Sequence, residues 1–490
     1  MKEHKHSCHS IEDVVPQRSF LDDEIILTDI ARRYDGKLLL EVEYDLPREI
    51  FSKLVANQIL SPVTPIRKSF LMTKCMRCQN DQKHLFGMIN CACCQKKHLY
   101  CRHCIHMGRV MECTPLYEWT GQSVIWPNHV EPCSWEGELT MIQAQAAMRM
   151  KEATERNKTI LTWAVTGSGK TEMLFPSIDV ALKMGKRICI ASPRADVVRE
   201  LLPRLRQAFL KISIQGLYGG SRDKDGSAQL IVATTHQLFR FKHAFDLLII
   251  DEVDAFPYHH DVSLQIATQR AKRVNSSLIY LTATPREEQR KQMMNKRLDY
   301  VFVPLRYHQQ LLPIPTFQLD TPLEKCLPQQ TLPEKFVHWL RNRRFPSRQL
   351  LVFVPTVKQI DHIKKLLRRM YALEVSETIY IESVHAEDLN REEKIIKFRK
   401  RLIHILITTT ILERGVTFPA IDVVVLDAHH EVFDEAALVQ ISGRAGRSKE
   451  DPTGEIMFFH NGKTNSMAKA KKDMTKMNKR ALLYKERKRN

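Results

Sequence analysis

The chain has 490 residues, 43% of them hydrophobic and 27% charged. This composition excludes a disordered chain, and the length exceeds what one hydrophobic core supports, so roughly three folded units are expected. Lysine and arginine outnumber aspartate and glutamate by 75 to 56, which gives a formal net charge of +19. The excess favours nucleic acid over an acidic or neutral partner, although a merely soluble basic surface has the same charge.

The start of the chain lacks the apolar core of a secretory signal, and no run of about 18 apolar residues occurs that would span a bilayer. We therefore expect a cytoplasmic protein. In that reducing compartment its twelve cysteines are not expected to form a disulfide framework, and seven of them lie between Cys75 and Cys104. This clustering favours metal binding.

Residues 1–70 form an N-terminal region without a chemical motif, and residues 71–110 carry the clustered cysteines. Two CxxC pairs, separated by residues 79–100, are Cys75, Cys78, Cys101 and Cys104. Four thiolates from two such pairs are the usual ligands of a structural Zn²⁺. Three further cysteines lie between the pairs, and the spacing alone leaves open a set in which Cys91 and Cys94 replace one pair.

Short apolar runs alternate with helical periodicity from residue 138 to residue 308, after a connector at 111–137. The runs are TILTWAV (159–165), RICIASP (187–193), LIVATT (230–235), LLIIDE (247–252) and LIYLTAT (278–284). Such runs, separated by helices, predict a parallel sheet covered on both faces. Polar motifs follow these runs, where open α/β sheets bind their ligands.

A second α/β domain is predicted at 333–465, after a proline-bearing linker at 309–332. Its apolar runs are QLLVFVP (349–355), TIYIESV (378–384), HILITTT (404–410) and VVVLDA (423–428). Residues 466–490 are rich in lysine and arginine and lack a strong apolar stripe, which indicates a basic tail with helical character.

The sequence AVTGSGKT follows the first run and predicts a phosphate-binding loop. Its backbone and side chains would hold ATP through Thr166, Gly167, Ser168, Gly169, Lys170 and Thr171. Lys170 is expected to meet the β- and γ-phosphates, and the Thr171 hydroxyl is expected to bind Mg²⁺. The first glycine usual in this pattern is Ala164 here, and GSGKT by itself is also compatible with a coincidental turn.

The sequence LLIIDEVD places two carboxylates at the end of an apolar strand. We expect Asp251 to hold Mg²⁺ and Glu252 to orient the attacking water, the alternative being a pair that caps a strand at the surface. Gln143 has an amide able to pair with N6 and N7 of adenine, although a lone glutamine is more often a polar helix residue.

These strings occur together, and in the same order, in superfamily 2 helicases. The set is AVTGSGKT, ASPR (191–194), TTHQL (234–238), DEVD, LTATP (281–285), TTTILERGV (408–416) and QISGRAGR (440–447). From about residue 70 to 475 the chain more closely resembles the ComFA late competence family, whose motor is similar to that of the PriA helicase. The resemblance implies two tandem RecA-like α/β domains with parallel sheets, preceded by a small Cys₄ zinc module.

The resemblance also implies roles in the second domain. Arg444 and Arg447 would reach across the interdomain cleft to the γ-phosphate, and Gly415 would contact the nucleotide. Thr282, Thr284 and Thr410 would couple the site to the bound strand. Without the family, two such arginines would more commonly belong to a solvated basic helix face. Gly443 and Gly446 argue against it here, since they weaken a helix and permit close approach.

For the cysteines, KCMRC and LYCRHCIHMGRV are similar to the two knuckles of the family. The resemblance therefore implies Cys75, Cys78, Cys101 and Cys104 as the zinc ligands, and a closed site of this kind supports structure rather than hydrolysis.

The function implied is an ATP-dependent single-stranded DNA translocase that drives transforming DNA into the cytoplasm. Its implied partners are single-stranded DNA, the DNA-uptake channel, and competence proteins such as ComFC and DprA, and self-association is compatible with it. The protein would lie peripherally at the inner face of the cell membrane. The alternatives are a PriA-like duplex unwinder and a zinc-containing DNA-binding scaffold with a vestigial ATP fold; the intact Lys170, Asp251 and Glu252 argue against the scaffold.

Overall fold

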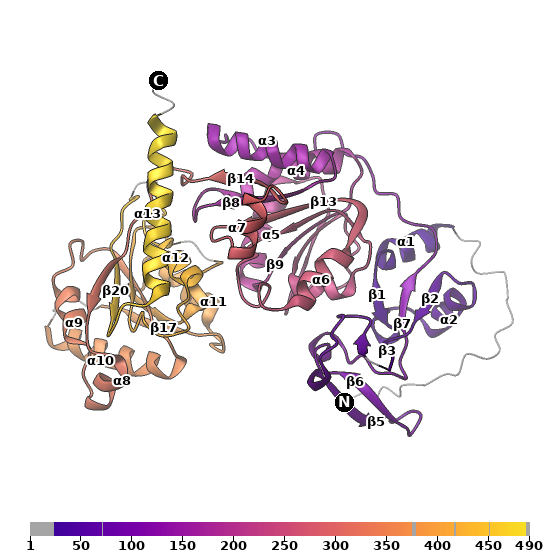
Figure 1. The fold of residues 1–490 in the computed structure, drawn as a ribbon, viewed down its shortest axis with the longest axis horizontal. Helices are drawn as coiled ribbons and strands as arrows, with labels where there is room; N and C mark the ends of the chain where they lie inside the picture. Colours follow the sequence, from indigo (N-terminus) through magenta and orange to yellow (C-terminus); the bar gives the residue numbers. More distant parts are fainter. Residues whose placement is uncertain (1–23, 71, 375–378, 416–417, 450, 487–490) are drawn as a thin grey trace.

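Two parallel β-sheets organise most of the chain, and an N-terminal module lies beside the first of them (Figure 1). The computed structural model describes residues 24–70, 72–374, 379–415, 418–449 and 451–486. Within these ranges, no helix combines the length and the apolar character that crossing a membrane requires.

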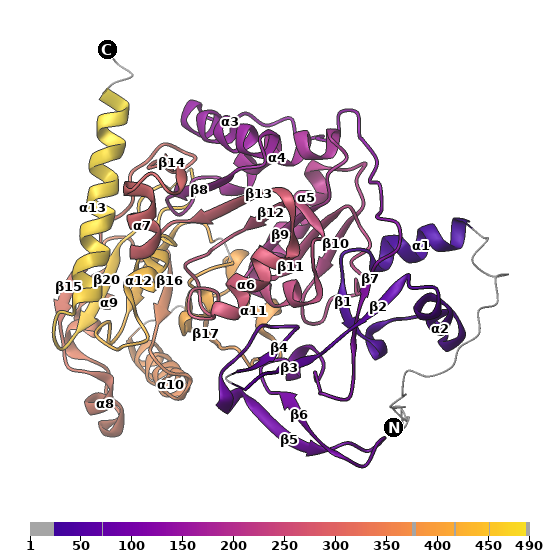
Figure 2. The ribbon, with the colours of Figure 1, turned by 45° about the vertical axis from the view of Figure 1, so that its right-hand side comes forward.

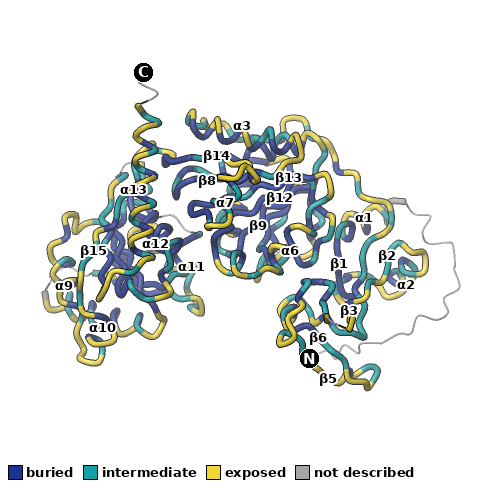
Figure 3. The backbone as a smooth tube through the Cα atoms, in the orientation of Figure 1, coloured by how far each residue is buried: buried dark blue, intermediate teal, exposed yellow. Residues whose placement is uncertain are grey.

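The first α/β domain has a seven-stranded sheet in the order β10-β11-β9-β12-β13-β8-β14. Its strands are β8 (Thr159–Ala164), β9 (Ile188–Ser192), β10 (Ile214–Leu217), β11 (Leu230–Thr234), β12 (Phe245–Ile250), β13 (Lys272–Thr282) and β14 (Asp299–Val303). Its helices are α3 (Met141–Glu155), α4 (Lys170–Lys183), α5 (Ala195–Ala208), α6 (Val262–Ala271) and α7 (Glu287–Met294). Every strand pairing is parallel, and the strands are largely buried, as the continuous apolar runs predicted (Figure 3).

The second α/β domain has a six-stranded parallel sheet in the order β15-β20-β19-β16-β18-β17. Its strands are β15 (Thr316–Leu319), β16 (Gln349–Phe353), β17 (Ile381–Val384), β18 (Ile405–Thr408), β19 (Ile421–Val425) and β20 (Ile456–His460). Its helices are α8 (Leu323–Cys326), α9 (Glu334–Arg341), α10 (Val357–Glu374), α11 (Arg391–Arg399) and α12 (Glu435–Ser442). The segment predicted as a linker contains both β15 and α8. Strand β15 forms there because it pairs with β20 and extends the sheet.

The N-terminal module contains a three-stranded antiparallel sheet in the order β1-β7-β2 and two separate hairpins. Its elements are α1 (Glu24–Tyr34), β1 (Leu38–Leu40), α2 (Arg48–Ala56), β2 (Leu60–Val63), β3 (Ile66–Lys68), β4 (Thr73–Cys75), β5 (Phe86–Asn90), β6 (Lys97–Cys101) and β7 (Leu116–Trp119). The central strand β7 comes from the segment predicted as a connector. The structure therefore joins that segment, residues 24–70 and the cysteine region into one module.

A partly buried network of charges fixes this module to the first α/β domain. Arg77, which is fully buried, donates to Glu43 at 2.9 Å, and Arg240 of the first domain reaches the same carboxylate at 3.1 Å. The guanidinium of Arg270 in α6 donates to the main-chain oxygen of Arg77. Because the fully buried Arg77 would be costly to leave without its partner Glu43, the network ties the module to one position on the domain.

The last helix, α13 (Asn465–Glu486), packs across both α/β domains instead of forming a free tail (Figures 1 and 2). Its buried face consists of Met467, Ala470, Met474, Met477 and Ala481. Farther along, Asn478 exchanges two 2.8 Å hydrogen bonds with the main chain of Leu312, and the guanidinium of Arg480 lies over the rings of Trp163 and Phe302. The helix thus connects the second domain to β8 and β14 of the first.

Candidate nucleotide site and cysteine clusters

A cavity of about 580 Å³ lies between the two α/β domains, within the usual range for small-ligand sites. The structure brings to its walls every residue that the sequence predicted for the nucleotide. From the first domain these are Gln143, Thr166, Gly167, Ser168, Gly169, Lys170, Thr171, Asp251 and Glu252, and from the second Gly415, Arg444 and Arg447. The site is therefore complete only where the two domains face each other.

The phosphate loop turns sharply between β8 and α4. Gly167 and Gly169 have φ values of 76° and 75°, which glycine adopts without the penalty that a side chain brings. Helix α4 begins at Lys170, whose ammonium donates to the main-chain oxygen of Ala164 at 3.2 Å. The helix N-terminus and its unpaired N–H groups thus face the cavity and favour an anion there.

The two carboxylates follow β12 directly. Asp251 is buried, and Glu252 has a φ of 55°, an uncommon value for a residue with a side chain. Burial and the neighbouring Glu252 raise the pKa of Asp251 to about 7, against the opposing effect of Lys170. Burial lowers the pKa of Lys170, because it disfavours the charged ammonium. The two adjacent carboxylates repel each other, so a cation bound beside them would stabilise their charged forms.

The second domain presents two arginines directly after α12, the buried Arg444 and the half-buried Arg447. The Nε of Arg444 donates to the main-chain oxygen of Glu413 at 3.0 Å, while its Nη1 has no hydrogen-bond partner among the described residues. Arg447 donates through Nε to the oxygen of Gly443 at 2.8 Å. Burial lowers the pKa of both guanidinium groups, and repulsion from Arg447 lowers the pKa of Arg444 further. A polyphosphate would stabilise these two adjacent cations.

Gly443 brings the backbone of the second domain into contact with the phosphate loop. A Cβ atom at this position would lie 2.1 Å from Oγ1 of Thr166 and 2.5 Å from its Cβ. Its φ of −65° suits any residue, so the close approach alone requires glycine here. In this structure, the loop that carries the arginines therefore rests directly against the loop that would hold the phosphates.

Arg414 belongs to the TTTILERGV string, but sequence reasoning did not single it out. Its guanidinium is buried and crosses the cleft to Asp254 at 2.5 Å and to Glu252 at 3.6 Å. Burial opposes ionisation of Asp254, but Arg414 and the hydroxyls of Thr282 and Thr284, each 2.6 Å away, hold the pKa of that carboxyl well below its usual range. This arginine therefore links the second domain to the carboxylate motif.

A further arginine, Arg306, was also missed, because a single arginine after a strand belongs to no motif. It follows β14 and is buried, and its guanidinium donates to the main-chain oxygens of Ala445, at 2.8 Å, and Gly446. The next residue, Tyr307, donates its N–H to Gly167 at 2.9 Å. One short segment thus contacts both the phosphate loop and the arginine loop.

Gln143 lies against the phosphate loop at the start of α3. Its Oε1 accepts hydrogen bonds from the N–H and the hydroxyl of Thr140, both at 2.8 Å, and its Nε2 donates to Ser168 at 2.9 Å. One Nε2 hydrogen remains available, whereas pairing Oε1 with an adenine amino group would require the Thr140 hydroxyl to move. The amide in this structure caps α3 and fixes the loop.

Threonines predicted to couple the site to a bound strand lie at the domain boundary. The hydroxyls of Thr282 and Thr284 both reach Asp254, as described above, while the main-chain oxygen of Thr410 accepts from Arg194 at 3.2 Å. Arg194 also pairs with Glu413 at 2.5 Å. These contacts connect the carboxylate motif and the ASPR string of the first domain with the second domain.

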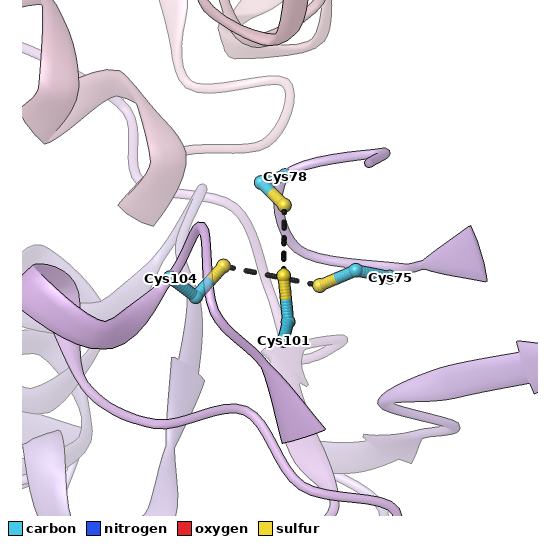
Figure 4. A group of neighbouring side chains, drawn as sticks. All are labelled: Cys75, Cys78, Cys101 and Cys104. Atoms are coloured by element: carbon cyan, nitrogen blue, oxygen red, sulfur yellow. Dashed lines mark hydrogen bonds between the residues drawn. The ribbon is translucent and has the colours of Figure 1, made fainter. Parts of the chain in front are cut away.

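Four buried cysteine sulfurs converge in the N-terminal module (Figure 4). They belong to Cys75, Cys78, Cys101 and Cys104 and lie within 4.8 Å of one another. Sγ of Cys75 and Cys104 are 3.8 Å apart, and those of Cys78 and Cys101 are 3.5 Å apart, close to the separation of thiolates around one tetrahedral metal ion. Cys91 and Cys94 belong to a different group, so the alternative set in which they replace one pair is not assembled.

Family models match three stretches of the chain. Residues 18–118 match the competence protein ComFA N-terminal domain, residues 136–287 match the type III restriction enzyme res subunit, and residues 332–449 match the helicase conserved C-terminal domain. The competence protein ComFA of Bacillus subtilis is 41% identical over 90% of this chain and 94% of its own length. That of Streptococcus pneumoniae is 38% identical over 78% of this chain and 86% of its own.

Solved helicases share the arrangement of the two α/β domains. Dbp5 of S. cerevisiae, bound to RNA and ADP BeF3, superposes with a TM-score of 0.52 at 18% identity, covering 69% of this chain and 88% of that one. The helicase Lhr of Mycobacterium smegmatis, bound to ssDNA and AMP-PNP, gives 0.52 at 16% identity over 70% and 50%. This likeness shows the tandem RecA-like fold for this chain.

Proposed function

Because the chain belongs to the ComFA family of competence proteins and carries both ATPase domains of a superfamily 2 helicase, we propose that it is an ATP-dependent single-stranded DNA translocase. Its hydrolysis of ATP would drive transforming DNA into the cytoplasm. The observation that carries this proposal is the interdomain cavity, where the phosphate loop and carboxylates on one wall face Arg444 and Arg447 on the other.

ATP binding is supported first by the phosphate loop. The N–H groups at the start of α4 and the ammonium of Lys170 would hold the β- and γ-phosphates. Ser168 Oγ is buried at the cavity and has no hydrogen-bond partner among the described residues, which leaves it available to a phosphate oxygen. The amide of Gln143 and the backbone at Gly415 would contact other parts of the nucleotide.

Magnesium fits the oxygen donors beside the loop. The Asp251 carboxylate and the Thr171 hydroxyl, both buried, would hold the ion. Burial and the neighbouring Glu252 raise the pKa of Asp251, so a bound cation would stabilise its charged form. A bound Mg²⁺ supplies charge neutralisation on the phosphates. Glu252 would accept a proton from the attacking water and orient it toward the γ-phosphate.

Hydrolysis would depend on closure of the two domains. Arg444 and Arg447 would stabilise the negative charge that develops on the γ-phosphate, and both belong to the second domain. When the domains close, Arg414 would contact Glu252 and Asp254, and Asp254 in turn accepts hydrogen bonds from Thr282 and Thr284. Cycles of closing and opening around ATP and its products would move a strand held across the two domains.

Single-stranded DNA is supported as the substrate by the family, the helicase fold and the net charge of +19. Contacts to phosphates make such binding independent of sequence and sensitive to salt. By the same family reasoning we propose as partners the DNA-uptake channel, ComFC and DprA, with self-association into an oligomer. The protein would act in the cytoplasm, peripherally at the inner face of the membrane.

Zinc is the metal proposed for the four-cysteine cluster. Four buried thiols at these distances match a closed tetrahedral site, which leaves no coordination position for water. The ion would hold the N-terminal module together where β4 and β6 end, while hydrolysis takes place in the separate interdomain cavity.

The proposal is tested by ATPase rates with single-stranded DNA, duplex DNA and RNA side by side, together with a strand-displacement assay. We expect strong stimulation by single-stranded DNA and no displacement. Lys170→Ala should abolish the stimulated hydrolysis and leave DNA binding largely intact, because the lysine faces phosphate and not DNA. Lys183→Ala, on the exposed end of the same helix, is the matched control. Hydrolysis retained in Lys170→Ala would refute the site, and strand displacement would assign duplex unwinding instead.

A further inference from the structure

A second group of metal-ligating side chains lies in the N-terminal module, apart from the four-cysteine cluster. The sulfurs of Cys91, Cys94 and Cys113 lie within 4.8 Å of one another. Nε2 of His98 lies 3.1 Å from Sγ of Cys94. Three thiols are thus gathered at the tip of the β5–β6 hairpin, and the imidazole of His98 lies beside one of them. The hairpin projects from the module in Figures 1 and 2.

The turn at Cys91 repeats the backbone of the turn at Cys75. In the first, the N–H of Cys75 donates to Asn80 at 2.9 Å, and four residues after the cysteine the N–H of Gln79 returns to Cys75 at 2.8 Å. In the second, the N–H of Cys91 donates to Lys96 at 2.9 Å, and that of Gln95 returns to Cys91 at 3.0 Å.

The residue in the fourth place after each cysteine also shares a left-handed conformation, with φ of 61° at Gln79 and 55° at Gln95. A CxxC turn of this shape points both sulfurs toward one side, as two ligands of one ion require. Because the first turn contributes two thiols to the four-cysteine cluster, its repeat indicates the same use for Cys91 and Cys94.

Strand register brings the third thiol to the same place. Beyond β6 the chain returns antiparallel to that strand, with a bridge between Tyr100 and Met111 and a 3.0 Å hydrogen bond from the N–H of Glu112 to Leu99. Continued by one residue, this register sets Cys113 opposite His98. Backbone pairing with β6 therefore places Cys113 near the hairpin tip.

The second ring nitrogen of His98 faces a carboxylate. Nδ1 lies 3.9 Å from Glu112 Oε2, and the same oxygen accepts the N–H of Leu99 at 2.8 Å. The other oxygen of Glu112 pairs with Lys68. Metal-bound histidines usually direct their other nitrogen to a carboxylate, which fixes the ring and leaves the lone pair of Nε2 for the ion.

The β5–β6 hairpin has almost no apolar core to stabilise it. Its buried residues between 86 and 101 are Gly87, Cys91 and Cys101, while Met88 is 53% exposed and the other apolar side chains are half-buried. A two-stranded hairpin with little apolar burial is marginally stable in water. The returning segment pairs with Leu99 and Tyr100, and the four-cysteine cluster includes Cys101, all toward the base of the hairpin. A further constraint at the turn would therefore stabilise the tip.

We propose that Cys91, Cys94, Cys113 and His98 bind a second zinc ion. Binding would release the protons of the three thiols, and His98 would keep its proton on Nδ1 beside Glu112. With four protein ligands the site is closed to water, so its role is structural: it would fasten the hairpin tip to the returning loop at residues 110–113. This inference does not depend on the nucleotide site.

Zinc content of the full-length protein, measured by plasma mass spectrometry, tests this proposal. We expect two zinc ions per chain in the unmodified protein, and one in Cys91→Ser/Cys113→Ser and in Cys75→Ser/Cys104→Ser. Cys93→Ser, in the same turn but outside the group, should keep two. One ion in the unmodified protein, unchanged by Cys91→Ser/Cys113→Ser, would overturn the proposal.

Cobalt substitution keeps the test decisive if a double variant folds poorly. In the Co²⁺-loaded protein, His98→Cys should retain two ions and shift the visible ligand-field bands, whereas His98→Ala should lose intensity or metal. His84→Ala, elsewhere in the module, should leave the spectrum unchanged, and ATPase activity without DNA checks folding in each case. Bands that do not respond to either His98 variant, or a disulfide found between Cys91 and Cys113 by thiol titration, would refute the second site.

Discussion

The nucleotide cavity and the cysteine module differ in whether their functional side chains find partners within the protein. At the cavity, buried charges from two domains face open space, and Arg444 Nη1 and Ser168 Oγ have no hydrogen-bond partner among the described residues. In the module, sulfurs from a single stretch of chain converge on one another. A site whose halves come from two domains is able to couple ligand binding to movement, whereas a site closed within one module gives rigidity.

The two regions also differ in how they join their surroundings. The cavity is bridged by ion pairs that cross between domains, such as Arg414 with Asp254, and these must break if the domains separate. The module is held by the Arg77, Glu43 and Arg240 network and by apolar packing on the first domain. Movement is therefore expected at the cavity and not at the module.

Among the substitutions that distinguish the mobile cavity from the rigid module, we expect replacement of Arg414 to lower hydrolysis most. Arg414→Ala leaves the buried Asp254 without its cation in the closed arrangement, which costs about 3 kcal/mol and so disfavours closure by about 100-fold. We expect a fall of that order in DNA-stimulated kcat. Arg368→Ala removes an exposed pair with Glu382 and is the control. An unchanged kcat in Arg414→Ala would show that closure does not use this contact.

Filling the space at Gly443 tests the close approach of the domains without removing a charge. Gly443→Ala places a methyl group 2.1 Å from Thr166 Oγ1, and we expect kcat to fall about tenfold from overpacking of roughly 1–2 kcal/mol. Gly462→Ala, where nothing lies within 4 Å of the added atom, should have no effect. Full activity in Gly443→Ala would indicate that the reactive arrangement is more open than this structure.

The smallest effect on hydrolysis is expected from the cysteine cluster. Cys75→Ser/Cys104→Ser should release the zinc of this cluster, because it removes two of the four ligands. The module should then become more sensitive to protease. Basal ATPase activity should change by less than about threefold, since none of these cysteines lines the cavity. Cys133→Ser lies outside both clusters and serves as the control. Loss of basal hydrolysis comparable to that of Arg414→Ala would contradict the separation of the two regions.

Much of the fold was predictable because buried parallel strands are continuous apolar runs. The strands at 159–164, 188–192 and 245–250 follow this rule. The short strand β10 and the edge strands β14 and β15 carry no such run, and only pairing with distant segments makes them strands. Helix α13 was expected as a tail, although its buried residues at 467, 470, 474, 477 and 481 repeat at intervals of three and four, a signal weakened by two alanines.

The predicted site residues were those with a local motif, and the missed ones lacked it. Lys170 and Asp251 lie in short sequence motifs, each of which predicts a chemical role from a few adjacent residues. Arg306 and Cys113 acquire their positions through strand register and domain contact, which no spacing in the sequence reveals. Arg414 stood within a recognised string, yet its partner Asp254 lies in the other domain, so only the folded chain shows the pair.

The central claim, that hydrolysis requires the second domain to complete the site, is tested most directly in Arg444→Ala. ATP binding and DNA-stimulated hydrolysis should be measured on the same protein, with Arg341→Ala on α9 as a control. The account predicts that kcat falls by about 10³-fold while the Kd for ATP changes little, because the phosphate loop is intact. Hydrolysis at the unmodified rate, or loss of ATP binding in place of catalysis, would contradict it.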